Sequence, residues 1–151
     1  MGNYIYINVT TIPEMVVLMS EANVLPIPEL KLELVPVSVS NLDRAKAFYV
    51  EQLGFHVDHD VQPSDTVRVI QLTPTGSACS ILLGAGLPGV EIPPGSLRGL
   101  HLVVTDINKA REALLSRGVE VGEIDDQGGM KYASLQDPDG NTWALQEMPT
   151  P

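Results

Sequence analysis

A repeat with an offset of about 64 residues constrains this chain more than any other feature of its sequence. Three short segments recur in the same order: residues 41–45 correspond to 106–110, residues 54–57 to 118–121, and residues 73–76 to 137–140. The first pair shares a polar residue before a helical pattern, the second pair shares a glycine after that pattern, and the third pair shares a Pro-x-Gly turn. A fixed offset of this kind indicates two similar structural units in one chain.

Both units follow the same order of elements. An apolar, β-rich segment comes first, and Asn41 or Asp106 then stands where its side chain can cap a helix by accepting from free backbone N–H groups. Apolar residues recur at helical spacing until Gly54 or Gly118, where a left-handed residue suits the end of a helix. The predicted strands are residues 32–39, 55–61, 67–72 and 78–83 in the first unit, and 100–104, 119–124, 131–136 and 142–146 in the second. Each unit is therefore βαβββ, and the predicted fold class is α+β.

The two βαβββ half-domains are expected to form a single domain over residues 31–148. The first half covers about residues 31–84, a linker rich in Gly and Pro about 85–98, and the second half about 99–148. One helix covers one face of a four-stranded sheet, so the other face must be buried by the partner half or by a second subunit. Residues 1–30 are predicted to be an N-terminal extension, in which residues 4–9 have strand propensity.

The charge balance limits the partners of the chain. Its formal net charge is −10 and it has no Lys/Arg run, which argues against nucleic-acid binding. An acidic surface attracts cationic small molecules, and it also keeps a protein soluble. No segment approaches the roughly 18 apolar residues of a membrane span, and the first 19 residues lack the features of a secretory signal. We therefore expect a cytoplasmic protein with no membrane partner.

The single cysteine, Cys79, excludes an internal disulfide. It lies in an apolar segment that is predicted to be a strand. A small core residue is a more common role for such a cysteine than a nucleophile.

Four motifs occur in order between about residues 33 and 147: residues 39–49, Leu53-Gly54-Phe55, residues 104–107, and Asp137-Pro138-Asp139-Gly140-Asn141. Together with the repeat, they resemble the vicinal oxygen chelate superfamily, which contains glyoxalase I, bleomycin-resistance proteins and extradiol dioxygenases. The resemblance implies the glyoxalase/bleomycin resistance/dihydroxybiphenyl dioxygenase-like fold, a ligand groove between the sheets, and a homodimer. It says little about the reaction, because one fold hosts many functions.

Metalloenzymes of this superfamily place His, Gln or Glu at four inward strand positions, two in each half. When these positions are carried over through the helix starts and the turns, they fall on Leu34, Ser80, Gly99 and Ala144. Side chains of Leu, Gly and Ala cannot supply the nitrogen or oxygen donors that a divalent metal needs. No cofactor is therefore predicted, and a divalent metal would require displaced ligands.

The strongest candidate for a functional side chain is His101. Strand alternation turns it toward the groove, two residues from the mapped position at Gly99. Its imidazole could serve as a base, a hydrogen-bonding anchor or a displaced metal ligand, or it could have no special role. Gln146 is placed on the same face, where it could bond a ligand amide or hydroxyl. The predicted ligand-binding residues are Ser80, His101, Gln146, Leu34 and Ala144, His101 is the candidate catalytic residue, and no metal ligand is predicted.

Other polar groups are interpreted as structural or solvated. His56, Asp58 and Asp60 are expected on one face of an edge strand, with His59 on the other, and solvation explains them better than a metal site. Residues 125–130 form a polar, Gly-rich segment that could be a lid or an ordinary flexible loop. Asp137 and Asp139 belong to a turn and are interpreted as structural. Glu33 and Glu147 each lie one residue away from a mapped ligand position, which turns their side chains to the wrong face of the sheet.

The leading hypothesis is a metal-free small-molecule-binding protein of the glyoxalase/bleomycin-resistance type. The alternative is a glyoxalase-like lyase, isomerase or hydrolase that uses His101 as an acid or base, with or without a displaced metal. A third possibility is a degenerate module with only an interaction role, which an exposed apolar patch without a pocket would support.

Overall fold

The computed structural model describes residues 23–87 and 91–151. The chain divides into two compact units, Met1–Lys31 and Leu32–Pro151. The predicted strand propensity at residues 4–9 lies outside the described residues. No helix in the described part of the chain is long and apolar enough to cross a membrane.

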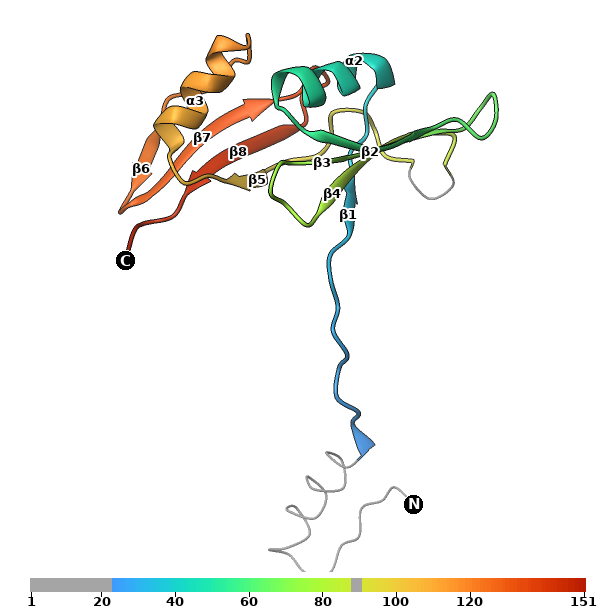
Figure 1. Cartoon of the computed structure of the whole chain (residues 1–151), viewed down its shortest axis with the longest axis horizontal. Helices are drawn as coiled ribbons and strands as arrows, with labels where there is room; N and C mark the ends of the chain where they lie inside the picture. Colours follow the sequence, from blue (N-terminus) through green and yellow to red (C-terminus); the bar gives the residue numbers. More distant parts are fainter. Residues whose placement is uncertain (1–22, 88–90) are drawn as a thin grey trace, which may run out of the picture. The chain divides into compact units, whose positions relative to one another are not determined.

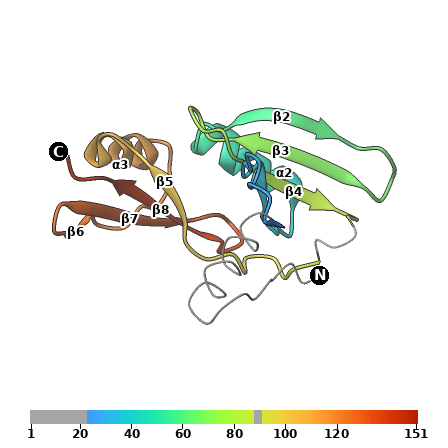
Figure 2. The same ribbon diagram turned by 90° about the horizontal axis from the view of Figure 1, so that it is seen from below.

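The second unit contains two four-stranded sheets and confirms the predicted α+β fold (Figures 1 and 2). Its elements are β1 (Leu34–Pro36), α2 (Leu42–Ala47), the π-helix η1 (Phe48–Gln52), β2 (His56–Val61), β3 (Arg68–Thr73), β4 (Ser80–Ala85), β5 (Leu100–Val103), α3 (Ile107–Ser116), β6 (Asp125–Gln127), β7 (Met130–Gln136) and β8 (Thr142–Glu147). The sheet orders are β1-β4-β3-β2 and β5-β8-β7-β6, so the two halves have the same topology. In each sheet, the first and last strands of the half pair in parallel and the other pairs are antiparallel.

The helix boundaries follow the capping residues of the repeat. The side chain of Asn41 accepts a hydrogen bond from the Arg44 N–H, and that of Asp106 accepts one from the Lys109 N–H. Gly54 and Gly118 adopt positive φ angles of 75° and 81°, which a glycine adopts without steric cost. The chain needs one residue more between the cap and the glycine in the first half than in the second. The π-helix η1 contains this extra residue, because a π-turn is a one-residue insertion in a helix.

The second half departs from the predicted strands in one place. Residues 119–124 do not form a strand; the strand β6 begins at Asp125. Val119 and Val121 are buried, and the Gly122 N–H donates to the Ser134 carbonyl at 2.8 Å, so this segment packs beside β7 without a continuous ladder. The Gly-rich segment 125–130 is consequently no free loop or lid: it forms most of the β6–β7 hairpin, with Gly128 and Gly129 at its turn.

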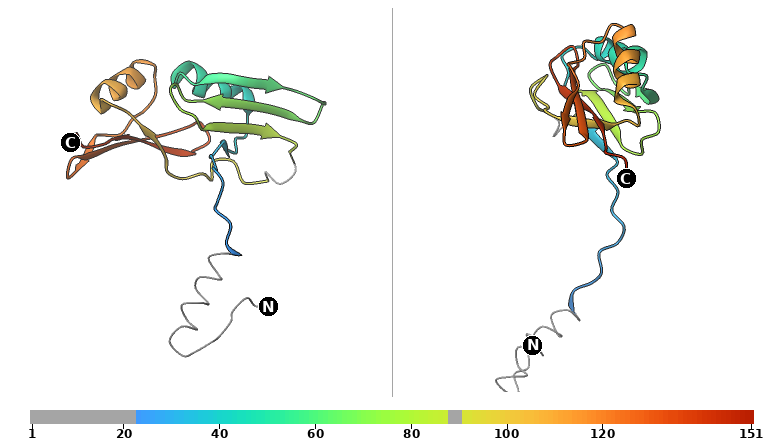
Figure 3. Two further views of the ribbon diagram at one scale, coloured as in Figure 1. Left: turned by 60° about the horizontal axis from the view of Figure 1, so that its bottom comes forward. Right: turned by 90° about the vertical axis from the view of Figure 1, so that its left-hand side faces the viewer.

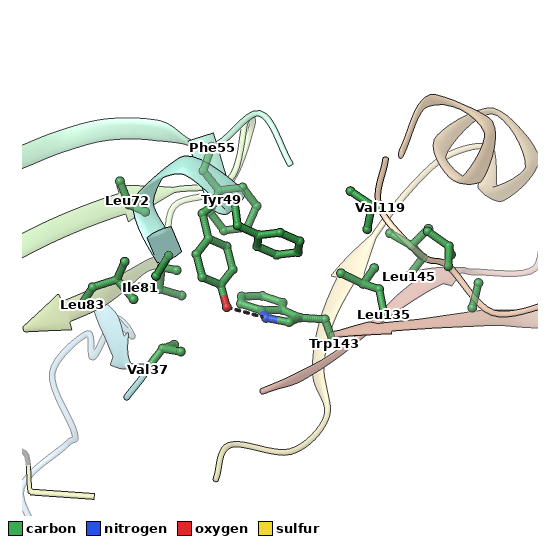
Figure 4. Packing of buried hydrophobic residues seen from close by; sticks show 14 of the residues in the cluster. Val37, Tyr49, Phe55, Leu72, Ile81, Leu83, Val119, Leu135, Trp143 and Leu145 are labelled. Carbon is green, nitrogen blue, oxygen red and sulfur yellow. Dashed lines mark hydrogen bonds between the residues drawn. The ribbon is translucent and has the colours of Figure 1, made fainter. Parts of the chain in front are cut away.

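The core lies between the helices and one face of each sheet. Its strand residues alternate along the sequence, as half-buried sheets require. They include Ile70, Leu72, Ile81 and Leu83 in the first half, and Ala133, Leu135, Trp143 and Leu145 in the second. Where the halves meet, the rings of Tyr49, Phe55 and Trp143 contact one another with centroids 5.4–5.8 Å apart (Figure 4).

A buried polar network joins the halves at this aromatic cluster. The Tyr49 hydroxyl donates to Asp137 Oδ2 at 2.7 Å and accepts from Trp143 Nε1 at 3.0 Å. The Asn141 amide donates to the same carboxylate oxygen at 2.8 Å and to the Ser38 carbonyl at 2.9 Å. The turn that contains Asp137 is therefore a structural connection between the two halves, in agreement with its interpretation from the sequence.

The buried phenol of Tyr49 makes stability sensitive to alkaline pH. Burial disfavours the phenolate, and the negative charge of Asp137 adds to this, so the pKa of Tyr49 lies well above its usual value. A group with a raised folded-state pKa contributes its full stability below the unfolded pKa, here about 10, and loses it as the pH rises further.

We expect Tyr49→Phe to be less stable than the wild type at pH 7, because Asp137 and Trp143 each lose a partner. The difference should shrink between pH 9.5 and pH 11.5, because only the wild type must ionise this phenol on unfolding. Urea midpoints across these pH values measure the effect, with Tyr132→Phe, on the face of the sheet away from the core, as the matched control. A difference that stays constant with pH would contradict the expectation.

Candidate functional site

The candidate site lies on the sheet faces that the helices do not cover. Both helices lie on the same side of the two sheets, as Figure 1 and the left view of Figure 3 show. The opposite face of each sheet is not buried by the partner half: Val103 of β5 is 67% exposed and Val61 of β2 is 50% exposed. The sequence left two ways of burying this face, by the partner half or by a second subunit, and the structure of one chain excludes burial by the partner half. The uncovered faces also do not oppose one another within one chain.

His101 and Gln146 form the centre of the uncovered face of the second sheet. Strand pairing aligns His101 with Ala144 and Val103 with Gln146, so these side chains share a face. The Nδ1 of His101 lies 2.6 Å from Gln146 Oε1. Because the amide oxygen only accepts, Nδ1 must carry the hydrogen, and in the neutral ring Nε2 is then an acceptor available to a ligand.

Three side chains that the sequence analysis did not assign complete this cluster. The ring of Tyr132 lies edge-on to that of His101, with centroids 5.9 Å apart and an interplanar angle of 78°. The amide nitrogen of Gln146 lies 3.4 Å from Met130 Sδ and 3.2 Å from Met148 Sδ. Tyr132 is opposite Gln146 in the β7–β8 register, and this register was the signal needed to assign its face.

Ser80 differs from His101 and Gln146 because it is buried and its hydroxyl bonds to side chains of its own sheet. It is 5% exposed, and its Oγ lies 3.2 Å from Gln71 Nε2 and 2.7 Å from Thr73 Oγ1. The Thr73 hydroxyl in turn donates to the Asp58 carboxylate. These four side chains form one polar chain on the uncovered face of the first sheet, next to Leu34, which pairs with Ser80.

The strand register refines the position that the superfamily pattern assigns to Ser80. Ser80 pairs with Leu34, whereas the Gly99 N–H donates to the Thr142 carbonyl, so Ser80 corresponds to Thr142. The counterpart of Ala144 is then Leu82, two residues further along. Mapping through the turn is misleading because three residues separate Gly76 from the start of β4 and only one separates Gly140 from the start of β8.

The residues at these four positions do not fit the divalent metal that the metalloenzymes bind. Leu34, Leu82, Gly99 and Ala144 offer no side-chain nitrogen or oxygen. Among the described residues, no group of three or more His, Cys, Asp and Glu is arranged to hold a metal ion.

The prediction for the histidine- and aspartate-rich strand β2 was wrong about its faces. A register shift between Val57 and His59 places His59 opposite Gln71, on the uncovered face, and Asp60 opposite Ile70, on the helix side. Asp60 there accepts hydrogen bonds from Arg68 and from Lys46, whose Nζ lies 2.7 Å away, and these bonds lower the pKa of Asp60 to about 2.

Glu147 has a structural role, and Cys79 lies outside the strand in which the sequence placed it. Glu147 lies on the helix side, as expected, where its Oε1 accepts from the Ile107 N–H at 2.9 Å at the start of α3. Cys79 is half-buried and precedes β4 instead of lying within it.

A cavity of about 720 Å³ lies beside the edge strand β5, on the helix side of the molecule. Its walls come from the end of the first helix, from the β3–β4 turn, and from β5 and α3. His101 and Val103 border it because β5 is the outermost strand of its sheet. The rest of the His101–Gln146 cluster does not line it.

Comparison with known proteins identifies the family. The family model of the Glyoxalase/Bleomycin resistance protein/Dioxygenase superfamily matches residues 31–145. No curated protein matches the chain.

Solved structures of similar proteins agree with this match. TnmS3, an antibiotic binding protein from Streptomyces sp. CB03234, is 36% identical, with a TM-score of 0.72, over 83% of this chain and 100% of that one. A glyoxalase/bleomycin resistance protein from the same organism is 38% identical (TM-score 0.66; 76% and 98% covered). A superfamily member from Sphaerobacter thermophilus DSM 20745 is 30% identical (TM-score 0.68; 79% and 98% covered). The repeat, the paired βαβββ halves and these matches together make this chain a member of the Glyoxalase/Bleomycin resistance protein/Dioxygenase superfamily.

Proposed function

We propose that this protein binds a small, partly aromatic molecule on the uncovered face of its second sheet, without a divalent metal. The observation that carries the proposal is the arrangement of His101, Gln146 and Tyr132: a hydrogen-bonded imidazole and amide beside an aromatic ring, on a sheet face that the chain leaves open. Ligand sites commonly combine a few oriented polar groups with apolar and aromatic walls.

Each side chain of the cluster has a distinct task in this proposal. Nε2 of His101 accepts a hydrogen bond from the ligand, while Gln146 holds the imidazole in position through Nδ1. Tyr132 contacts a ligand ring edge-on or in an offset stack. The thioethers of Met130 and Met148 adapt to an irregular apolar outline and make favourable contacts with aromatic rings.

The proposal includes a homodimer. The two uncovered faces of one chain do not oppose one another, so a closed groove needs a second copy that lays its first sheet against this cluster. Leu34 and the polar chain around Ser80 would then form the opposite wall. Isologous two-fold contacts are the commonest way for a soluble chain to cover such a surface.

Metal-independent binding is supported by the residues at the mapped ligand positions, which lack suitable donors. The similarity to TnmS3, an antibiotic binding protein, supports a ligand of the same broad kind, namely a drug-sized organic molecule. The acidic chain, with its net charge of −10, would increase the encounter rate with a cationic ligand. His101 as an acid or base of a glyoxalase-like enzyme remains a prediction.

The test is a thermal-shift titration with bleomycin and a panel of planar aromatic antibiotics, with and without EDTA, together with elemental analysis of the purified protein. A ligand at about 100 times its Kd adds about 2.7 kcal/mol of stability, which corresponds to a rise in Tm of about 5–10 °C for a chain of this size. We expect the same shift with EDTA and no product in the supernatant. Stoichiometric metal that is lost in His101→Ala, or turnover of a ligand, would overturn the metal-free binding function.

A further inference from the structure

Two aromatic side chains fill the place in the first half that is equivalent to the cavity beside β5 in the second. In both helices an alanine, Ala45 or Ala110, follows the cap by four residues, and the residues three and four positions later face the other half. In the first half these are Phe48 and Tyr49, both buried. In the second half they are Ala113 and Leu114, which line the cavity.

The side chains at these positions explain why one place is filled and the other is open. Tyr49 reaches Asp137, in the β7–β8 connection of the other half, and its ring packs against Trp143 (Figure 4). Leu114 faces the β3–β4 turn in the same way, but it is shorter and has no hydroxyl with which to bond that turn. Replacing two large aromatic rings with a methyl group and a leucine leaves a volume that the core does not fill.

A single guanidinium stands at this cavity. Arg117, which caps the C-terminus of α3, lines it, and a Cβ atom added to Gly54 would lie 3.6 Å from Arg117 Nη1. Among the described residues, the other four arginines have partners: Arg44, Arg68 and Arg111 form ion pairs, and Arg98 donates to backbone carbonyls. The Arg117 guanidinium forms no ion pair or hydrogen bond with any described residue; only the backbone of Arg117 is bonded, to the Gln52 side chain and to the Leu114 carbonyl.

We propose that this cavity is a second binding site, and that it takes a small amphipathic anion. The apolar part of the ligand, a ring system or short hydrocarbon chain, lies against Phe55, Ala113 and Leu114. Its carboxylate or sulfonate pairs with Arg117, because a planar guanidinium binds such groups with two parallel hydrogen bonds. The volume of about 720 Å³ lies within the range of small-molecule sites.

The ligand class follows from the balance of groups at the site. The walls are mostly apolar side chains from both halves, and the polar group without a partner is cationic, in a chain whose net charge is −10. A neutral apolar ligand would leave the guanidinium unused, and a cation would be repelled by it. The site shares only His101 with the His101–Gln146 cluster of the proposed function, since neither Gln146 nor Tyr132 lines the cavity.

The probes for the test are 8-anilinonaphthalene-1-sulfonate, which is fluorescent in apolar surroundings, and N-phenyl-1-naphthylamine, which has the same ring system without the sulfonate. We expect the full chain to bind the sulfonate more tightly than the neutral probe. Arg117→Gln should weaken the sulfonate about fivefold and leave the neutral probe within a factor of two, because a partly exposed ion pair is lost. The matched control is Lys109→Gln, which removes one positive charge from the same helix and does not line the cavity.

A second variant tests the volume of the cavity. Ala113→Phe places in the second half the residue that fills the first half at Phe48, and it should weaken both probes at least fivefold. Gln146→Ala, in the His101–Gln146 cluster, should leave the affinities for both probes unchanged. Equal effects of Arg117→Gln and Lys109→Gln would overturn the proposal. A change in sedimentation coefficient for Arg117→Gln with no change in probe affinity would overturn it too, since the surface would then be a contact between copies of the chain.

Discussion

Asp137→Ala is expected to lower the free energy of unfolding by about 3–5 kcal/mol, because it leaves several buried polar groups without partners. The carboxylate accepts four hydrogen bonds: from the Tyr49 hydroxyl, from the Asn141 amide, and from the backbone N–H groups of Asp139 and Asn141. Alanine accepts none of them. Asp137 is 3% exposed and Tyr49 is fully buried, so water cannot replace the lost acceptor at the centre of the network.

The measurement is equilibrium urea unfolding at pH 7, followed by the fluorescence of the single tryptophan, Trp143, whose indole donates to Tyr49. Asp65→Ala is the matched control, since Asp65 is an exposed aspartate in the β2–β3 connection, and it should change stability by less than about 0.5 kcal/mol. Asp137→Asn should fall between the two, because its amide keeps one acceptor oxygen. A loss below about 1 kcal/mol for Asp137→Ala would show that the network does not hold the halves together.

His101→Ala is expected to weaken the ligand found in the thermal-shift screen by at least tenfold. The substitution removes the acceptor Nε2 and leaves the oxygen of Gln146 without its 2.6 Å partner on the binding face. Gln146→Ala should have a similar effect, because the imidazole then loses the group that orients it. The affinity of the double variant should lie within about threefold of the affinity of either single variant, because both substitutions break the same interaction.

Isothermal titration measures the three affinities, and unfolding midpoints check that the variants fold normally. Glu120→Gln, at an exposed position before β6, is the control and should bind like the wild type. Strictly additive losses for the two single variants would show that His101 and Gln146 contact the ligand independently. Wild-type affinity for His101→Ala would place the ligand elsewhere and refute the proposed function.

The sequence predicted the architecture because the repeat is marked by residues with strong local preferences. Asn41 and Asp106 cap their helices, and Gly54 and Gly118 adopt the left-handed conformation that ends them. These residues act over a few positions of the chain, so their effect can be deduced without knowing the tertiary structure. The same is true of the alternation that turns His101 away from the core.

Single-residue irregularities account for what the sequence did not predict. The bulge after Val57 reverses the faces of His59 and Asp60, and the π-helix adds one residue to the first helix. The bulge leaves no mark in composition or periodicity, because it depends on the partner strand. The longer spacing between cap and glycine in the first half is visible in the sequence, but it does not by itself say that the extra residue forms a π-turn. For the site, the missing information was register: Tyr132 joins His101 only because β7 pairs with β8 in one particular alignment.

The polar chain from Asp58 through Thr73 and Ser80 to Gln71 has a consequence for ligand discrimination. Its hydroxyls and amide already bond to one another, so the first sheet offers a ligand a polar surface with few free hydrogen-bond donors or acceptors. A site rejects an analogue strongly when the analogue fails to satisfy one of its buried polar groups, and only weakly when shape alone differs. The first sheet should therefore tolerate isosteres and homologues of a ligand, whereas any strict chemical preference of the protein should originate at the imidazole nitrogen of the second.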